Sequence, residues 1–210
     1  MSAADDLLQL IRERRSVRSF ADEPVDKDAI AKLVEAAAWA PSAGNRQDWL
    51  FAAVLSAGTK REMAEIVRRR WGEIIDANRD HGFIEEFERY AATFADFEKA
   101  PAVIVVAARK PDAIQLHLLG EEATAAAGGA ASAAMAAQNL MLAAHALGLG
   151  TCCMTGALAA RGELASLLGL GRRMEIVCLI ALGRPAGLRG PIAPPAPPRK
   201  PITEILRFVE

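Results

Sequence analysis

The sequence predicts an α+β protein, in which helices pack against a small sheet. Segments with helical spacing of apolar residues separate a few strand-like runs, and the two kinds do not alternate regularly. A doubly wound parallel sheet requires regular alternation, so this order argues against that fold. The dinucleotide fingerprint of such sheets is also missing, because neither G-x-G segment has the third glycine in place.

Length and composition predict one domain, residues 1–210. Hydrophobic residues make up 52% and charged residues 24% of the chain, which is typical of a globular protein. The 25 basic and 26 acidic side chains nearly cancel, so no overall field would attract nucleic acid or anionic lipid. The N-terminus carries acidic residues where a secretory signal needs basic ones. We therefore expect a cytoplasmic protein that binds neither nucleic acid nor membrane.

The first half of the chain predicts helices around a single strand. Helical spacing of apolar residues indicates helices over residues 4–14 and 26–40. The apolar run 49–56 is typical of a strand, and the charged region 62–99 predicts two helices that meet near residues 80–82.

Aromatic residues recur at intervals of three or four in that charged region: Phe83, Phe87, Tyr90, Phe94 and Phe97. Such a stripe usually packs into a core. The alternative is a lid or a wall that faces a substrate, and the sequence leaves both open.

The second half predicts two strands, a long helix and an irregular tail. The β-branched run 102–108 indicates a buried strand, and a second strand covers 174–183. Between them, residues 123–149 predict one Ala-rich helix of about 28 residues, whose polar positions make it a poor membrane span. The Pro-rich residues 189–206 should run extended along a surface, because proline cannot join a sheet interior.

Three cysteines occur, and Cys152 and Cys153 are adjacent. This spacing forms no regular disulfide framework and matches no zinc motif, so no metal site is expected. We expect small buried thiols.

A basic segment, RERRSVRSF, follows the first predicted helix. If the chain becomes extended after Arg15, alternation places Arg14, Ser16 and Arg18 on one side. Two guanidinium groups and a hydroxyl suit a phosphate. The alternative is that these arginines only complement a helix C-terminus and face solvent.

A second segment, WAPSAGNRQDW, places short polar side chains between two tryptophans. Turn chemistry alone accounts for its proline, serine, glycine and asparagine. Amide side chains beside aromatic rings also suit a planar heterocycle with polar edges. In a third segment, TCCMTGAL, a strand turns into a helix start around Thr155 and Gly156, where backbone N–H groups either donate to a ligand or form an ordinary cap.

These segments, with QNLMLAAHALGLGTCCMTG, ALGRP and PPRKP, closely resemble the FMN-dependent nitroreductase family over essentially the whole chain. The resemblance implies an α-β sandwich with a central, mainly antiparallel sheet flanked by helices. It also implies a homodimer whose C-terminal tail extends onto the partner subunit, with two FMN sites at the interface.

The resemblance also assigns flavin-binding roles. Arg14 and Ser16, in the segment that contains Arg15, would hold the FMN phosphate. Arg18 would lie near the pyrimidine edge, where positive charge stabilises the anionic reduced flavin. Arg199 and Lys200 of the tail would also contact the phosphate.

Two further segments complete the implied site. Pro41, Ser42, Ala43 and Asn45 match a loop from the opposite subunit, although Ala43 replaces the commoner second serine. Gln47 belongs to the same loop, and the proline usual after it is an aspartate here. The backbone of Met154, Thr155 and Gly156 would approach the flavin nitrogen that takes hydride.

The implied activity is ping-pong oxidoreduction, with NADH or NADPH as donor and a nitroaromatic, quinone or related electrophile as acceptor. No side chain need act as a catalytic nucleophile, because the flavin carries the reaction. The alternatives are other flavin chemistry on the same fold, such as flavin fragmentation or dehalogenation, and a non-enzymatic flavin-binding protein.

Overall fold

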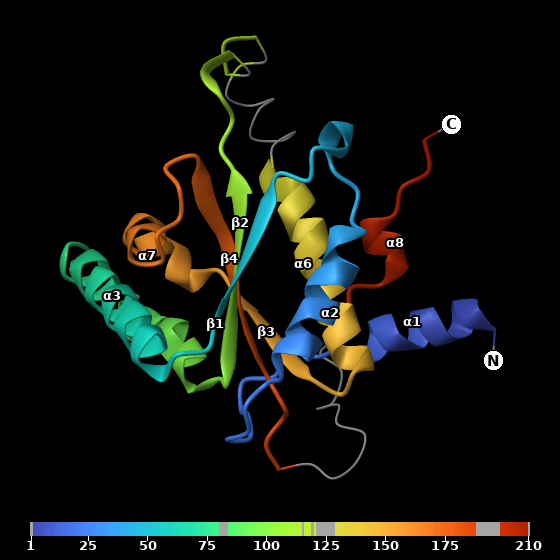
Figure 1. The fold of residues 1–210 in the computed structure, drawn as a ribbon, viewed down its shortest axis with the longest axis horizontal. Coiled ribbons are helices and arrows are strands. Elements are labelled where there is room, and N and C mark those ends of the chain that lie inside the picture. Colours follow the sequence, from blue (N-terminus) through green and yellow to red (C-terminus); the bar gives the residue numbers. More distant parts are fainter. Residues whose placement is uncertain are drawn as a thin grey trace.

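A computed structural model describes residues 2–79, 84–114, 116–118, 120, 129–187 and 198–209. A four-stranded antiparallel sheet crosses the molecule, with helices on both faces (Figure 1). The strands are β1 (Trp49–Val54), β2 (Ala102–Arg109), β3 (Gly150–Met154) and β4 (Met174–Gly183). Their order in the sheet is β1-β2-β4-β3, so β1 and β3 form its two edges. The predicted α+β class is confirmed.

Seven helices and three 3₁₀ segments are described. The helices are α1 (Ala3–Glu13), α2 (Lys27–Ala38), α3 (Ala57–Asp76), α4 (Ile84–Ala91), α6 (Gly129–Ala146), α7 (Arg161–Leu167) and α8 (Ile202–Ile205). The 3₁₀ segments are η1 (Ala43–Asn45), η2 (Ala92–Lys99) and η3 (Gly156–Ala160). None of the described helices is long and apolar enough to cross a membrane.

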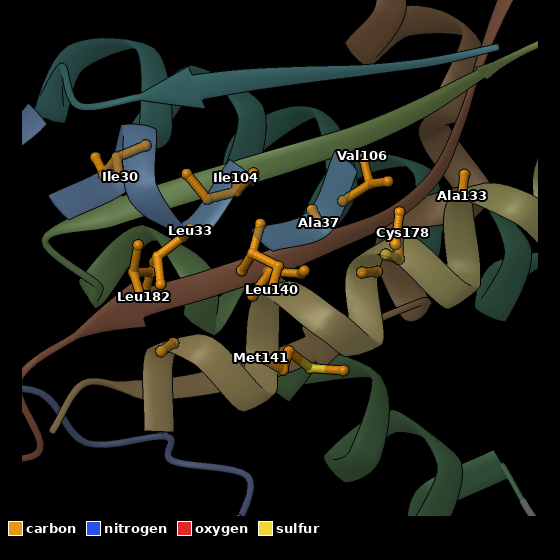
Figure 2. Close-up of a cluster of buried hydrophobic side chains, with 14 of the residues drawn as sticks. Ile30, Leu33, Ala37, Ile104, Val106, Ala133, Leu140, Met141, Cys178 and Leu182 are labelled. Atoms are coloured by element: carbon orange, nitrogen blue, oxygen red, sulfur yellow. The ribbon is translucent and has the colours of Figure 1, made fainter. Parts of the chain in front are cut away.

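Helices α2 and α6 cover one face of the sheet (Figure 1). Leu33 of α2 and Leu140 of α6 pack toward Ile104 of β2 and Leu182 of β4 (Figure 2). Alanines on α6 let the helix approach closely, because they add little volume between backbone and sheet. Helices α3 and α7, with η2, cover the opposite face through a second buried cluster. The central strand β2 is therefore buried on both sides, as its continuous apolar run predicts.

A buried lysine ties α3 to the start of β2. Lys60 is 6% exposed, and its Nζ donates to the backbone oxygens of Ala100 and, at 3.0 Å, Pro101. Burial lowers the pKa of Lys60 below its ordinary value, and the charge of Asp22 opposes that shift. Both carbonyls lie just before the first residue of β2, and buried backbone oxygens need a hydrogen-bond donor. The Lys60 ammonium is the donor for both.

Parts of three predicted segments lie outside the described residues, and one of these predictions changes. The described part of the Ala-rich helix is α6, of 18 residues, and 121–128 lie outside the described residues. The tail is not wholly extended, because 202–205 form one helical turn, while 188–197 lie outside the described residues. Pro201 is the last proline of the chain, so every residue after it has a backbone N–H group that can donate within that turn. The junction of the two charged helices also lies outside the described residues.

Two apolar surfaces are left uncovered in the single chain. Helix α1 exposes Leu7, Leu8 and Ile11 and buries none of its residues. All described residues of the tail, 198–209, are exposed, and its large apolar side chains are Ile202, Ile205, Leu206, Phe208 and Val209.

Candidate functional site

The basic segment runs along the free edge of β3. Beyond Arg14, which has extended backbone (ψ 130°), Ser16 forms a parallel bridge with Thr151. The Val17 N–H donates to the Thr151 carbonyl at 2.9 Å. Gly150 permits this approach, because a Cβ there would lie 2.7 Å from the Cβ of Val17. The predicted extended conformation is thus present and fixed against the sheet.

Further hydrogen bonds hold the other end of this segment. The Ala21 N–H donates to Arg184 O at 2.8 Å, and the Ala186 N–H donates to Ser19 O at 3.0 Å. Arg18 lies between the two anchored ends, so its backbone position is well defined.

The three arginines of the basic segment behave differently, and Ser16 pairs with β3 without lining the cavity described below. Arg18 lines a cavity, and the charge of Arg14 acts on the thiol of Cys153 in β3. Arg15 turns away from this region: its Nη1 donates to Arg14 O at 2.9 Å and also to Arg12 O. Arg15 therefore complements the C-terminus of α1, as the alternative interpretation holds, but its Nε is buried without a hydrogen-bond partner among the described residues and does not face solvent. The Arg15 side chain does not line the cavity.

The cavity lies beside the end of β3 and has a volume of about 350 Å³. Its walls are the basic segment around Arg18, the rings of Tyr90 and Phe94, and the run 152–156. This volume falls in the range that small-molecule sites occupy. Of the predicted site residues, the structure brings Arg18, Met154, Thr155 and Gly156 together here.

Trp71 supports the cavity wall without lining the cavity, and the sequence analysis missed it. Its Nε1 donates to the carbonyl of Gly156 at 2.8 Å, across 85 positions of sequence. The Trp71 ring packs against Phe94 at 5.0 Å and Phe87 at 5.4 Å between centroids. The only sequence signal for this role was a tryptophan within the charged helix α3, because its hydrogen-bond partner is remote in sequence.

The aromatic stripe serves both as core and as wall. Phe97 is fully buried, whereas Tyr90 and Phe94, whose rings meet at 4.7 Å, line the cavity. Phe94 lies so close to Gly156 that a Cβ there would come within 2.3 Å of the ring. Phe83 lies outside the described residues.

Trp71→Phe is expected to lower the free energy of unfolding by about 1 kcal/mol, because the Gly156 carbonyl loses its donor while an aromatic ring remains. Urea denaturation followed by circular dichroism measures this loss. Trp39→Phe is the matched control, since Trp39 is 83% exposed, and should leave the stability unchanged. Equal stabilities of the two variants would contradict the role given to Trp71.

The polar loop before β1 is locally rigid. Gly44, Asn45 and Gln47 have positive φ values of 59°, 53° and 50°. The Gln47 N–H donates to Ser42 Oγ at 3.0 Å, and Gln47 Nε2 donates to Asn45 Oδ1 at 3.2 Å. These bonds hold the left-handed residues in place.

Asp48, the residue that departs from the family pattern, anchors this loop. Its carboxylate pairs with Arg46 at 2.8 Å and Arg109 at 3.2 Å, and its carbonyl accepts from the Arg109 N–H at 2.8 Å. Fixing the loop by ion pairs replaces the conformational restriction that a proline would supply.

Within one chain, the loop does not reach the cavity. It precedes β1, whereas the cavity lies at β3, on the other edge of the sheet. Three strand spacings of about 4.8 Å separate these edges by roughly 14 Å. The residues that the structure leaves apart from the cavity are Pro41, Ser42, Ala43, Asn45 and Gln47. Arg199 and Lys200 of the tail are exposed and do not line it either.

The model of the nitroreductase family matches residues 11–184, most of the chain. The chain belongs to the nitroreductase family. A NADH dehydrogenase of Thermus thermophilus is 31% identical to this nitroreductase-family protein over 186 residues, 83% of this chain and 84% of that protein. A 4-nitrobenzoate reductase of Nocardioides sp. is 28% identical over 234 residues, 95% of this chain and 88% of that protein.

A solved structure also resembles this chain in fold. A BluB-like flavoprotein from Clostridium difficile 630 has a TM-score of 0.80 and 25% identity, covering 97% of this chain and 99% of that one. The family and the fold expected from the sequence are both confirmed, and the family is one of oxidoreductases.

Proposed function

We propose that this protein is an FMN-dependent oxidoreductase that takes electrons from NAD(P)H and reduces nitroaromatics, quinones or related electrophiles. The observation that carries the proposal is the cavity at the end of β3, where Arg18, two aromatic rings and the backbone of Thr155 and Gly156 converge. The names of the two curated relatives, a NADH dehydrogenase and a nitrobenzoate reductase, support this donor and this acceptor class.

The groups around the cavity fit a flavin. A planar heterocycle can lie against the rings of Tyr90 and Phe94, and its polar edge can meet backbone groups of Met154 to Gly156. Arg14, Ser16 and Arg18 alternate along an extended segment, so cations and a hydroxyl lie at the side where phosphate would bind. The name of the solved C. difficile relative, a flavoprotein, supports the same cofactor.

When bound, FMN supplies two-electron chemistry by alternating reduction and reoxidation. The residues of the chain would bind the cofactor, orient the reactants and set the charge around the flavin ring. Arg14 and Ser16 would hold the phosphate, and the Arg18 guanidinium would favour negative charge on the reduced ring. Tyr90 and Phe94 would orient a planar donor or acceptor against that ring.

A homodimer would complete the site. The polar loop at 41–47 lies on the opposite sheet edge from the cavity, so only a partner's copy can reach it without unfolding the sheet. The exposed apolar faces of α1 and of the tail supply surface that a partner would cover. Arg199 and Lys200 of that partner's tail would then approach the phosphate.

An anaerobic stopped-flow experiment tests the activity. Visible absorbance of FMN-loaded protein is followed while NADH or NADPH is added, and then menadione or nitrofurazone. Bleaching by a nicotinamide and recovery with the acceptor are expected. A flavin that no nicotinamide reduces would overturn the proposal and would favour other flavin chemistry or a non-enzymatic flavin-binding role.

Truncation before Pro194 is expected to convert the dimer to a monomer and to abolish measurable FMN binding, because it removes the apolar tail and both tail cations. Light scattering after gel filtration measures the mass, and quenching of FMN fluorescence measures binding. The double variant Arg199→Ala, Lys200→Ala is the control that keeps the apolar tail: it should stay dimeric and bind FMN more weakly. A truncated monomer with unchanged FMN affinity would contradict the shared site.

A further inference from the structure

A second cavity opens between helix α7 and the turn at residues 171–174 that leads into β4, and we call it the α7 cavity. Helix α7 lies beside β4 (Figure 1). The α7 cavity has a volume of about 430 Å³, and no described residue lines both it and the cavity beside β3. This volume falls in the range of small-molecule sites. The α7 cavity is therefore a separate candidate site.

The floor of the α7 cavity is apolar and locally fixed. Gly169 has a φ of 63° and follows the end of α7, and the Leu170 N–H then donates to the Ala165 carbonyl at 2.9 Å. This hydrogen bond folds Leu170 back onto α7. Leu170 and Ala165 line the cavity together with Ile176, which is 2% exposed. The floor can therefore hold an apolar or planar group.

Backbone hydrogen bonds hold two cations at the rim. The Met174 N–H donates to the Gly171 carbonyl at 2.8 Å, which closes the turn that carries Arg172. The Lys110 N–H, just beyond the end of β2, donates to the Arg173 carbonyl at 2.7 Å. The backbone positions of Lys110 and Arg172, which both line the cavity, are therefore well defined.

The charged groups that line the α7 cavity do not balance. Three cations, Lys110, Arg161 and Arg172, line it, and Glu175 is the one carboxylate among its described lining residues. Arg161 Nη1 lies 3.7 Å from Glu175 Oε2. Within the described part of the chain, neither Lys110 nor Arg172 forms an ion pair through its side chain. The lining therefore carries an excess of two positive charges.

The cations of helix α3 are arranged differently. Arg68, Arg69 and Arg70 are consecutive and exposed, and each pairs with a glutamate. Cations gathered around one cavity without matching carboxylates repel one another, and an anionic ligand relieves that repulsion. A phosphate monoester carries about −1.5 to −2 charges at neutral pH, which matches the excess, and guanidinium groups bind phosphate with two parallel hydrogen bonds.

We propose that the α7 cavity is a second binding site, which takes a small phosphate-bearing ligand with an apolar or planar body, the class of the nucleoside monophosphates. The phosphate meets Lys110, Arg161 and Arg172 at the rim, and the body lies on the floor against Leu170 and Ile176. This site is distinct from the flavin cavity of the proposed function and does not depend on that function.

Equilibrium dialysis of radiolabelled AMP against the full-length protein tests the proposal. AMP should bind with a Kd below about 1 mM, and adenosine should compete at least tenfold more weakly than AMP, because it lacks the phosphate. Inorganic phosphate should also compete more weakly than AMP, because it lacks the planar body. Absence of AMP binding at 10 mM ligand, or equal competition by adenosine, would overturn the proposal.

Repeating the dialysis with one equivalent of FMN separates this site from the flavin cavity. AMP should bind equally well with and without FMN, and it should release no fluorescent FMN from the protein. Release of FMN by AMP would place AMP in the flavin cavity and would overturn the proposal. A protein that binds AMP but no FMN would leave the α7 site standing and would overturn the proposed function.

Two neighbouring arginines provide a matched pair of variants. Arg172→Ala should weaken AMP binding about tenfold, because it removes a charge-assisted contact to phosphate. Arg173 is the next residue and is also exposed, but its side chain does not line the cavity, and alanine retains the carbonyl that accepts from Lys110. Arg173→Ala should therefore change the affinity less than twofold. Equal losses would show that only long-range attraction acts, and would overturn the site.

A change of the opposite sign is expected at Glu175. Glu175→Gln removes the negative charge from the described lining and releases Arg161 from its ion pair. AMP should then bind about threefold more tightly, an effect of the order that one exposed charge produces. Weaker binding of AMP by Glu175→Gln would contradict a phosphate held at this rim.

Discussion

Lys60→Ala is expected to lower the free energy of unfolding by about 3–5 kcal/mol, the largest effect among the single substitutions considered. The ammonium donates to the carbonyls of Ala100 and Pro101, and removing it leaves two acceptors without a partner. Each unpaired buried acceptor costs about 1–3 kcal/mol. Loss of the buried lysine stem adds a cavity term, which brings the total into the range given.

The location of Lys60 explains why the structure cannot easily adapt. Pro101 lies against Gly183 at the end of β4, where a Cβ would come within 2.6 Å of the proline ring. The chain then enters β2, the central strand, whose interior positions are completely buried. Movement of Pro101 toward water would therefore disturb both central strands of the sheet.

Guanidinium denaturation at fixed protein concentration measures the loss, because any dimerisation makes stability concentration-dependent. Lys60→Met separates the unpaired carbonyls from the cavity, since it keeps most of the buried stem and removes only the donors. The free energy of unfolding of Lys60→Met should lie between those of wild type and Lys60→Ala. Lys99→Ala is the matched control, because that lysine forms an exposed ion pair with Asp96, worth about 0–1 kcal/mol. A Lys60→Ala variant as stable as Lys99→Ala would show that water replaces the ammonium.

The strands were the part of the fold most predictable from sequence. The predicted strand 174–183 coincides with β4, and 102–108 differs from β2 by one residue. The apolar run of β2 is continuous and that of β4 extends from Ile176 to Leu182, and each run ends at glycine, proline or charged residues, so pattern and boundary signals agree. The strand order was not predictable in detail, because β4 inserts between β2 and β3 through pairings that local sequence does not encode.

The candidate site was predictable where its residues are close in sequence. The basic segment and the run at Met154 to Gly156 are local motifs, and hydrogen bonds from Val17 to Thr151 bring them to one edge. Trp71 escaped prediction because its hydrogen-bond partner is a carbonyl 85 positions away. The expectation of buried thiols is correct for Cys152 and Cys178 and wrong for Cys153, which is exposed on the edge strand β3.

Arg14→Ala should weaken FMN binding about tenfold to a hundredfold, because a charge-assisted phosphate contact contributes roughly 1.5–3 kcal/mol. Ser16→Ala removes a neutral donor from the same side of the segment and should cost only about 1 kcal/mol, or roughly fivefold. Titration of FMN fluorescence against each variant measures both affinities.

Arg12→Ala provides the control for charge alone. Arg12 lies in the last turn of α1 and is exposed, and only its backbone carbonyl, which alanine retains, bonds Arg15. Both substitutions remove one positive charge from the same helix end, so long-range attraction of the phosphate falls similarly in each. A direct contact by Arg14 therefore requires its variant to lose much more affinity than Arg12→Ala. Equal losses would mean that Arg14 contributes only long-range attraction, and the phosphate contacts would then be left to Ser16 and to the tail cations Arg199 and Lys200.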